Sequence, residues 1–187
     1  MTSVYLAGPE VFLPHGRALI ERKRTICREF GLTPSELHGE FAVTPGTDAD
    51  AFGLAISERN EQLMDLSDIC LANLTPFRGP SADAGTVFEL GYMAAQGKPV
   101  YAFTNDPRDY GERVASSPGI TVLERDDGLF TADGEMVESH GMADNLMLEG
   151  GIRRRGYALF RSPVAPPNPW DDLSTFRRLV EHIAATR

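Results

Sequence analysis

The sequence predicts an α/β fold, a doubly wound parallel sheet with helices on both faces. Two observations support this prediction: short apolar segments alternate with segments of helical spacing, and the central run "ICLANL" is almost wholly apolar. Continuous apolar runs of this kind are typical of strands covered on both faces. Ligands of such sheets bind at the carboxyl ends of the strands, so we expect the loops after "SVYLA" and "ICLAN" to form a site.

The expected elements follow one another along the chain. A strand over residues 3–7 ends at a Gly-Pro turn signal, and residues 15–31 have apolar residues at helical spacing with a C-capping glycine. Residues 41–46, "FAVTPG", are expected to form a short second strand. The elements that follow are an amphipathic helix over 50–66, a strand over 68–74, a helix over 85–97 and a buried strand over 99–106.

The 187 residues are expected to form a single domain, residues 1–187. The segment 124–141 is polar and punctuated by glycines, which indicates an excursion from the sheet. The proline-rich residues 162–169 predict a stiff connector into a C-terminal helix over 170–186.

Composition excludes several classes of partner. The net charge of −9 and the pI near 4.9 argue against nucleic acid, whose binding normally requires a basic surface. The one dense basic patch, "RRR" at 153–155, is expected to be a solvated loop. No apolar run approaches the roughly 20 residues that span a bilayer, and no signal peptide precedes the first strand. With only two cysteines, we expect a cytoplasmic protein without a membrane partner.

Glu89 is the one charged residue of "GTVFELGYMAAQG", residues 85–97. On a helical wheel Val87, Leu90 and Ala94 form one stripe, and Glu89 points nearly opposite to it. Burying an unpaired carboxylate costs roughly several kcal/mol. Proteins tolerate this cost when a partner compensates the charge or when the ionised group has a function. Its place near a helix start favours negative charge and suits an anionic nucleophile. Composition alone favours the alternative of a salt-bridged or solvent-facing glutamate on a half-buried helix.

Two further residues could assist such a carboxylate. Asp83 stands just ahead of the helix and predicts an N-cap, a position that is compatible with a role at the rim of a site. Two carboxylates this close could divide the work of glycosidic chemistry. Tyr5 lies at the carboxyl side of the first strand, where its hydroxyl could orient a carboxylate or simply belong to a strand tyrosine.

Other chemistries have little support. The glycine-containing loops after the strands match neither the dinucleotide-binding nor the P-loop pattern. The four histidines are scattered without HxxxH or CxxC spacing, so we expect no metal and no cofactor. No serine lies in a GxSxG context, which leaves no case for a serine hydrolase.

Three pieces of the chain together resemble the nucleoside 2-deoxyribosyltransferase family. They are "VYLAGPEVF", "NEQLMDLSDICLANLTPFRGPSADAGTVFELGYMAAQGKPVYAFTND" and "DNLML", in the family's order. The resemblance covers roughly residues 3–105 and 144–148, and "ANLTPFRGPSADAGTVFELG" is its most specific part. It implies a flavodoxin-like fold and an enzyme that moves a 2-deoxyribosyl group between nucleobases, with nucleosides and nucleobases as its small-molecule partners.

The resemblance also implies roles for particular residues. Glu89 matches a nucleophile that attacks C1′ and holds the sugar as a covalent ester, so that a second attack gives overall retention. Tyr5 matches the residue that positions this glutamate, and Asp83 matches an aspartate that binds the sugar hydroxyls. In the loop after the first strand, the residues expected to bind substrate are Gly8, Pro9 and Phe12.

The separate match "DNLML" implies a shared site. Asn145 and Met147 match residues that a neighbouring subunit inserts to complete the sugar pocket. The resemblance therefore implies a homo-oligomer, a dimer or a multiple of dimers, that is inactive as a monomer.

One position departs from the family pattern. Asn60 stands where the family often has an aspartate beside the departing base, and an amide can donate a hydrogen bond but cannot deliver a proton by ionising. We expect Asn60 to bind substrate. The proton for the base could come from Asp83, Glu10 or solvent, or not be needed.

Two rival functions stay open from the sequence. The first is hydrolysis of nucleosides or their 5′-monophosphates through the same glutamate. The acid Glu10 disfavours phosphate, whereas Arg78 and the cluster at 153–155 favour it. The second is a non-catalytic module that senses nucleotides. Lost activity is disfavoured by the joint presence of Glu89, Asp83, Tyr5 and Asn145.

Overall fold

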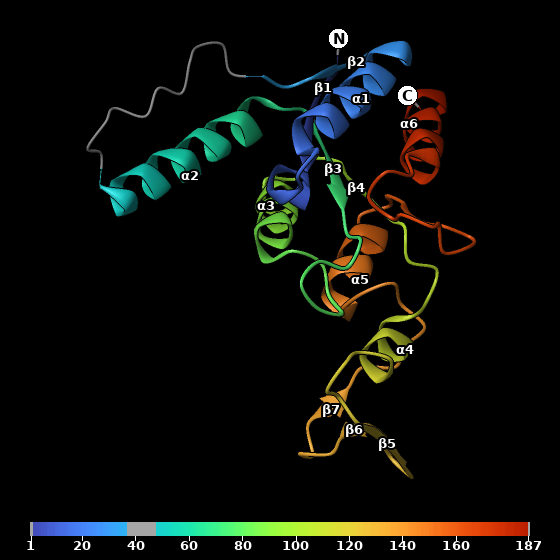
Figure 1. Ribbon diagram of the computed structural model, residues 1–187. Helices are drawn as coiled ribbons and strands as arrows, with labels where there is room; N and C mark the ends of the chain where they lie inside the picture. The colour runs from blue at the N-terminus through green and yellow to red at the C-terminus, as the bar shows by residue number, and fades with distance from the viewer. Residues whose placement is uncertain (1, 37–47, 187) are drawn as a thin grey trace.

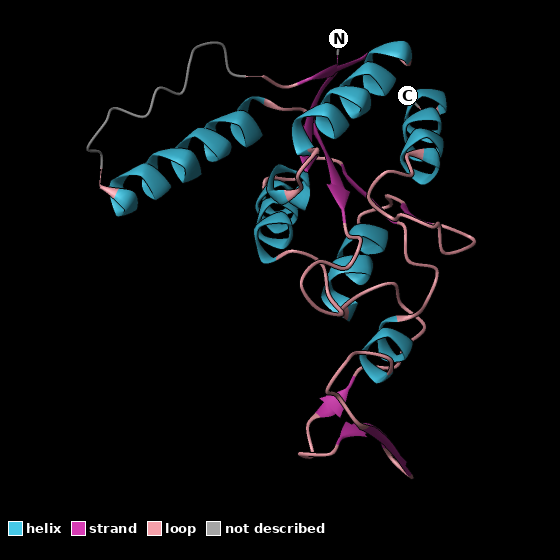
Figure 2. Cartoon of the chain, in the orientation of Figure 1, coloured by secondary structure: helices cyan, strands magenta, loops and turns pink. Residues whose placement is uncertain are grey.

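A five-stranded parallel sheet forms the centre of the protein (Figures 1 and 2). The computed structural model describes residues 2–36 and 48–186. The strand order is β2-β1-β3-β4-β8, and each neighbouring pair is parallel. The strands are β1 (Thr2–Ala7), β2 (Leu32–Pro34), β3 (Ile69–Asn73), β4 (Val100–Thr104) and β8 (Leu159–Arg161).

Helices cover both faces of this sheet, which confirms the predicted fold class. The cluster on one face contains side chains of α1 (Gly16–Glu29) and α6 (Ser174–Ala185). The cluster on the opposite face contains side chains of α2 (Ala49–Leu66), α3 (Ala84–Ala95) and α5 (Leu146–Arg154). α6 lies within the range 170–186 predicted for a C-terminal helix.

The alternation of side chains along β1 decides what faces the site. Val4 belongs to the cluster with α1 and α6, whereas Tyr5 and Ala7 belong to the cluster with α3, which contributes Leu90 and Met93. Successive side chains of a strand point to opposite faces of the sheet, so this register directs Tyr5 towards α3.

One predicted segment lies outside the described residues, and another is less buried than expected. The strand predicted over 41–46 lies outside the described residues, and the second strand of the sheet is Leu32–Pro34. This strand begins directly after Gly31, whose φ of 74° ends α1 in the left-handed conformation. The helix expected over 50–66 forms as α2, but Met64 is its one fully buried described residue, because much of this helix projects from the body (Figure 1).

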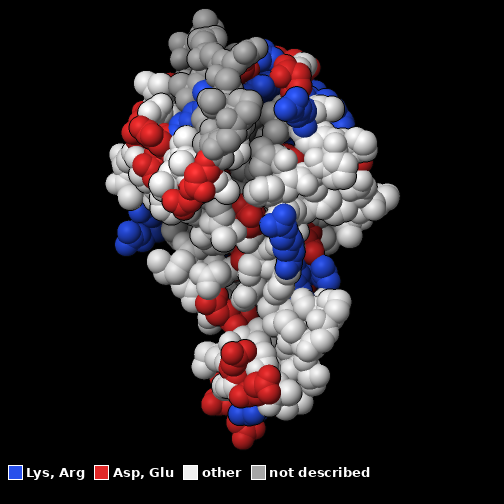
Figure 3. All heavy atoms as spheres, turned by 60° about the vertical axis from the view of Figure 1, so that its left-hand side comes forward, with Lys and Arg blue, Asp and Glu red and all other residues white. Residues whose placement is uncertain are grey.

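A small antiparallel sheet lies apart from the main one and contains much of the polar segment 124–141. Its strands are β5 (Val122–Arg125), β6 (Gly128–Thr131) and β7 (Met136–Val137), and α4 (Tyr110–Ala115) precedes them. Acidic side chains gather at its tip (Figure 3). The exposed acids of this sheet and its turns are Glu124, Asp126, Asp127, Asp133 and Glu135.

The basic cluster at 153–155 ends a helix and does not form the expected loop. Arg153 and Arg154 lie in the last turn of α5, and Arg155 is its C-cap. All three are exposed. Positive charge is favourable here because the carbonyl groups at a helix C-terminus carry partial negative charge.

A buried ion pair ties α1 to the short helix η1 (Pro9–Phe12) that follows β1. The ammonium group of Lys23 contacts the Glu10 carboxylate, and each residue is only 4% exposed. The same ammonium lies 4.8 Å from the centroid of the Phe103 ring and 5.3 Å from that of Phe176. Because both charges are out of water, each depends on the other for stabilisation.

We expect Lys23→Met to lower the free energy of unfolding by about 3–5 kcal/mol, because it leaves the Glu10 carboxylate buried without its counterion. Urea unfolding at neutral pH measures this change. Arg177→Met is the matched control, since Arg177 pairs with Glu29 at 2.8 Å on the surface, and its loss should cost less than about 1 kcal/mol. Equal costs for the two variants would show that burial does not strengthen the first pair.

Candidate active site

The side chains of Tyr5 and Glu89 meet between β1 and α3. The Tyr5 hydroxyl donates a hydrogen bond to Glu89 Oε1 at 2.5 Å, across 84 residues of sequence. Tyr5 is buried and Glu89 is half-buried. The hydrogen bond occupies one carboxylate oxygen and leaves Oε2 for other partners.

The buried face of α3 differs from the stripe that the helical wheel predicted. Thr86, Leu90 and Met93 are buried, and Glu89 borders this face. Val87 is only half-buried and lies beside the groove between α3 and α5. The carboxylate therefore lies against the core-facing side of the helix and is neither opposite the core nor free in solvent.

The pKa of Glu89 is raised from 4.5 to about 7. Burial is the main cause, the negative charges of Asp83 and Glu10 add to it, and the hydrogen bond from Tyr5 opposes it. Burial also raises the pKa of Tyr5, with the charge of Glu89 as the next cause, so Tyr5 keeps its proton and remains a donor.

The expected help from the helix start does not reach Glu89. α3 begins at Ala84, so Glu89 lies in its second turn, and the favourable field of the N-terminus falls off within the first. Asp83 takes this position instead. As the N-cap it accepts hydrogen bonds on Oδ2 from the Thr86 backbone N–H at 2.9 Å and from the Thr86 hydroxyl at 3.0 Å.

The loop after β1 approaches the end of β3 closely. Asn73 donates a hydrogen bond to Glu10 Oε1 at 2.7 Å, and the same oxygen contacts Lys23. A Cβ atom on Gly8 would collide with the Glu10 carboxylate and come within 3.2 Å of the Asn73 Cβ, so this position requires glycine. Pro9 is buried as the first residue of η1. Lys23 balances the charge of Glu10, which weakens the sequence argument that Glu10 repels phosphate.

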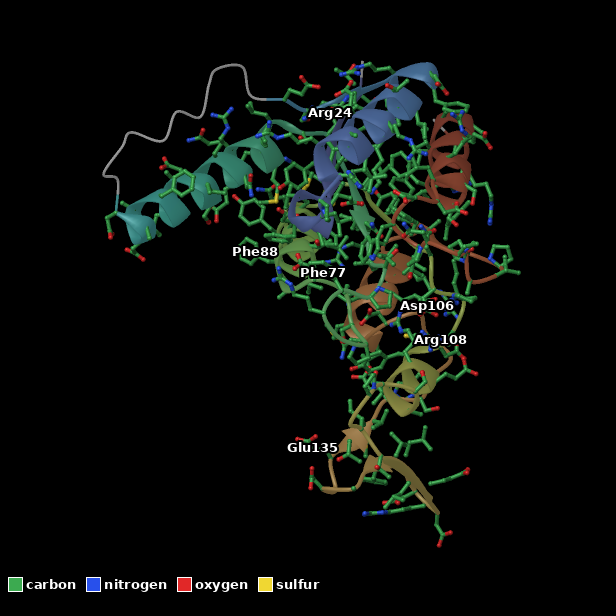
Figure 4. All side chains as sticks on the ribbon, viewed as in Figure 1. Arg24, Phe77, Phe88, Asp106, Arg108 and Glu135 are labelled. Carbon is green, nitrogen blue, oxygen red and sulfur yellow. The ribbon has the colours of Figure 1, made fainter. Side chains whose placement is uncertain are left out.

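Aromatic rings form the rim beside this loop. Phe12 is 56% exposed and stacks on Phe77, with ring centroids 5.7 Å apart. Trp170 meets Phe77 edge-on at 5.8 Å, and the Arg78 guanidinium lies 4.7 Å from the Phe77 centroid and 5.0 Å from that of Phe12. Figure 4 shows Phe77 close to η1 and α3. Of these residues, the sequence analysis placed Phe12 in the substrate site and named Arg78 as a cation that favours phosphate. The signal for Phe77 was its place in the loop after β3.

Asn60 is half-buried on α2, five residues before the contact that joins this helix to α3. In that contact Asp65 accepts hydrogen bonds from the Tyr92 hydroxyl at 3.0 Å and from Gln96 Nε2 at 2.6 Å. α2 also packs against β1, so Asn60 belongs to the layer of helices on the Tyr5 side of the sheet.

Asn145 and Met147 lie at the start of α5, the helix that faces α3 across a groove. Asn145 caps α5 by accepting from the Met147 N–H at 3.0 Å, and its side-chain amide donates to Glu138 at 2.7 Å. Met147 is 71% exposed and lines, with Val87, a mostly apolar groove of about 510 Å³ between α3 and α5. No contact that the structure gives among the described residues joins either residue to Glu89.

Asp144 holds the loop that leads into α3, a role that the sequence did not suggest. Asp144 Oδ2 accepts hydrogen bonds from the Ala82 N–H at 3.0 Å and from Arg113 at 3.1 Å. Both partners of this ion pair are almost fully buried. Burial raises the pKa of Asp144 and lowers that of Arg113. The pair fixes Ala82, the residue directly before Asp83.

Within residues 2–36 and 48–186, no group of three or more His, Cys, Asp or Glu side chains could hold a metal ion. Cys27 and Cys70 are buried free thiols, and burial raises the pKa of both, that of Cys27 to about 12. No helix in the described parts of the chain combines the length and apolar character needed to cross a bilayer.

Comparison with known proteins gives a consistent result. A family model described as nucleoside 2-deoxyribosyltransferase matches residues 4–147. An uncharacterized protein of Schizosaccharomyces pombe is 38% identical over 164 residues, which are 82% of this chain and 78% of the relative. The structure of a 2-desoxiribosyltransferase from Leishmania mexicana is similar with a TM-score of 0.64 and 28% identity, covering 97% of this chain and 99% of that one.

We expect Glu89→Gln to be more stable than the wild type at pH 8. The pKa of a glutamate is 4.5 in the unfolded chain and about 7 for Glu89 in the folded protein. The contribution of protonated Glu89 to the free energy of unfolding is therefore complete below pH 4.5 and is lost as the pH rises to 7. The ionised group then costs up to about 3 kcal/mol, which glutamine avoids. Urea unfolding from pH 5 to 8 measures this difference, which should shrink towards pH 5.

Glu21→Gln is the control, because the pH dependence of the Glu21 contribution to stability has the opposite sign. A hydrogen bond from Arg28 lowers the pKa of Glu21, so its contribution is present at neutral pH and lost in acid. A Glu89→Gln variant whose stability relative to wild type did not change with pH would contradict the raised pKa.

Proposed function

The chain belongs to the nucleoside 2-deoxyribosyltransferase family, and from this we propose that it moves the 2-deoxyribosyl group of a 2′-deoxynucleoside from one nucleobase to another. Membership supports a glycosyltransferase. The observation that carries the specific proposal is the Tyr5–Glu89 hydrogen bond, which holds a half-buried carboxylate in one orientation between β1 and α3.

The proposed reaction has two displacements at C1′. In the first, Glu89 Oε2 bonds to C1′ while the C1′–N bond breaks and its electron pair leaves with the base. In the second, a nitrogen of the incoming base attacks C1′ from the opposite side and releases the Glu89 carboxylate. Two inversions give retention of configuration.

Tyr5 and Glu89 divide the work of the first step. By donating to Oε1, Tyr5 keeps the carboxylate plane fixed and favours its ionised form, which is the nucleophile. The half-buried position strengthens the attraction between this carboxylate and the positive charge that develops on the sugar. It also limits the access of water, which would hydrolyse the ester.

The neighbouring residues suit a sugar and a planar base. Asp83 uses Oδ2 to cap α3, and we assign its other oxygen to the sugar hydroxyls. Gly8 and Pro9 let the backbone of the loop approach the substrate, and the exposed ring of Phe12 offers a surface on which a base can stack. We assign the amide of Asn60 to a hydrogen bond with the base.

The two carboxylates that could have supplied a proton to the departing base, Glu10 and Asp83, both have other partners. Glu10 is held in a buried ion pair with Lys23, and Asp83 accepts two hydrogen bonds as a cap. Both carboxylates are therefore engaged as hydrogen-bond acceptors. We propose that the base leaves without a proton from these residues and takes one from water afterwards.

Hydrolysis of nucleosides or their 5′-monophosphates is the rival function. One observation favours it: Arg78 is a cation at the rim of the site, and no ion pair joins it to an acidic group in the described residues. Transfer and hydrolysis share the glutamyl ester and differ in what captures it.

We expect incubation with a deoxynucleoside and a second base to give the exchanged deoxynucleoside, read by chromatography. Glu89→Ala should lower this rate by about 1,000-fold or more while the protein stays folded, because it removes the nucleophile. Glu181→Ala, on the exposed side of α6, is the matched control and should behave as the wild type. Free sugar formed at equal rates with and without the second base would identify a hydrolase.

We further propose that the enzyme is a homo-oligomer whose site is completed by a neighbouring subunit. Two observations support this: Met147 is 71% exposed, and the groove that it lines beside α3 is mostly apolar. Within the described residues no hydrogen bond or ion pair joins Asn145 or Met147 to Glu89, and we propose that these two residues act on the Glu89 of another copy.

A mixture of Glu89→Ala and Met147→Asp subunits tests this arrangement. Each variant alone should lose most of its activity, and exchange of subunits should restore activity above the sum of the two, because a hybrid contains one site with Glu89 and Met147 both intact. Sedimentation of the wild type checks the oligomer. An active monomer, or a mixture with no gain, would contradict the shared site.

A further inference from the structure

We propose that Arg78 binds the nucleobase that leaves the sugar and stabilises the negative charge that develops on it. This inference rests on the proposed transfer reaction and adds a catalytic residue to it. Arg78 lies in the loop between β3 and α3, between Asn73 and Asp83 in sequence.

The backbone of Arg78 is the first observation. Its φ is 59°, and Arg78 is the sole non-glycine residue with a positive φ in the described chain. A side chain in the left-handed region costs free energy that glycine avoids. Gly79 follows directly, so glycine occurs in this loop but not at the strained position. Strain of this kind persists where the side chain serves a function.

The loop holds this residue in place. The Phe77 N–H donates to the Ser81 carbonyl at 2.9 Å and so closes a turn around Arg78. The Ala82 N–H is fixed one residue later by the buried Asp144 carboxylate at 3.0 Å. Arg78 is therefore presented from a turn that is anchored on the side of Asp83.

The position of the guanidinium is the second observation. It lies 4.7 Å from the centroid of Phe77 and 5.0 Å from that of the stacked Phe12 ring. Arg108 and Arg161, by contrast, are in ion pairs at 2.5 Å with Asp106 and Asp109. In the part of the chain that the structure describes, no acidic group pairs with Arg78. Its N–H groups are therefore available at the aromatic rim, where we place the base.

The chemistry of the departing base matches these donors. When the C1′–N bond breaks, the electron pair spreads over the ring nitrogens and exocyclic oxygens of the base. A guanidinium has only N–H donors and keeps its proton at physiological pH, so it can stabilise this charge without transferring a proton. Asn60 can offer a neutral hydrogen bond but not the positive charge.

The test compares two classes of substrate in the full-length enzyme. A natural purine leaves as an anion, whereas an N7-methylated purine leaves as a neutral base with no negative charge to stabilise. We expect Arg78→Met to lower kcat/KM for the first class by about 10- to 100-fold and for the second by less than about 3-fold. Arg78→Lys should restore part of the loss, because it returns the charge but not the planar fork.

Two controls separate catalysis from folding. Arg78→Gly keeps the left-handed turn without strain and should show the same selective loss with a melting temperature no lower than the wild type. Arg125→Met removes an arginine that lies 4.6 Å over the Phe130 ring of the small sheet, and it should change neither class.

Three results would overturn the inference: equal losses for both substrate classes, unchanged activity in Arg78→Met, or a loss confined to nucleoside 5′-monophosphates, which would assign Arg78 to phosphate. Absence of base exchange in the wild type would instead overturn the proposed function, so the two failures are distinguishable.

Discussion

The hydrogen bond from Tyr5 to Glu89 is the contact on which the site depends. It joins the first strand to a helix 84 residues later, and it exists because two periodicities agree. The alternation along β1 directs Tyr5 to the α3 side of the sheet, and the turn of α3 brings Glu89 to the edge of its buried face. A shift of β1 by one residue would direct Tyr5 towards α1 and α6 and leave the carboxylate without its donor.

The carboxylates of Glu10, Asp83 and Glu89 lie close enough to influence one another, and their hydrogen-bond partners differ. Glu10 is bound to a buried ammonium, Asp83 to the first turn of α3, and Glu89 to a neutral hydroxyl. The first two are occupied by groups that fix them as acceptors. Burial raises the pKa of Glu89 to about 7, and the negative charges of Asp83 and Glu10 add to this rise. Neighbouring carboxylates with different environments can thus take structural and reactive roles within one site.

The sequence predicted those parts of the fold and site that follow from local pattern. The apolar runs of β1, β3 and β4 and the helix of Glu89 carry strong signals, and parallel strands bring their loops to one edge, so Tyr5, Asp83 and Glu89 could be grouped in advance. β2 has three residues and a proline, too few for a periodic signal. The pairs Glu10–Lys23 and Asp144–Arg113 are long-range contacts between side chains whose local sequence is unremarkable. The conformation of Arg78 depends on a turn that residue types alone do not specify.

The placement of α6 has a consequence for biosynthesis. Phe176, Leu179, Val180 and Ile183 of this helix fill the same cluster as Val4 of the first strand, so α1 alone covers that face of the sheet until α6 has been translated. A nascent chain that already contains β1, β3 and β4 therefore presents apolar strands before it can bury them, a state in which chaperone binding competes with aggregation. Tags or fusions that hinder the docking of this helix would prolong that exposure, even though α6 lies on the face of the sheet opposite to Glu89.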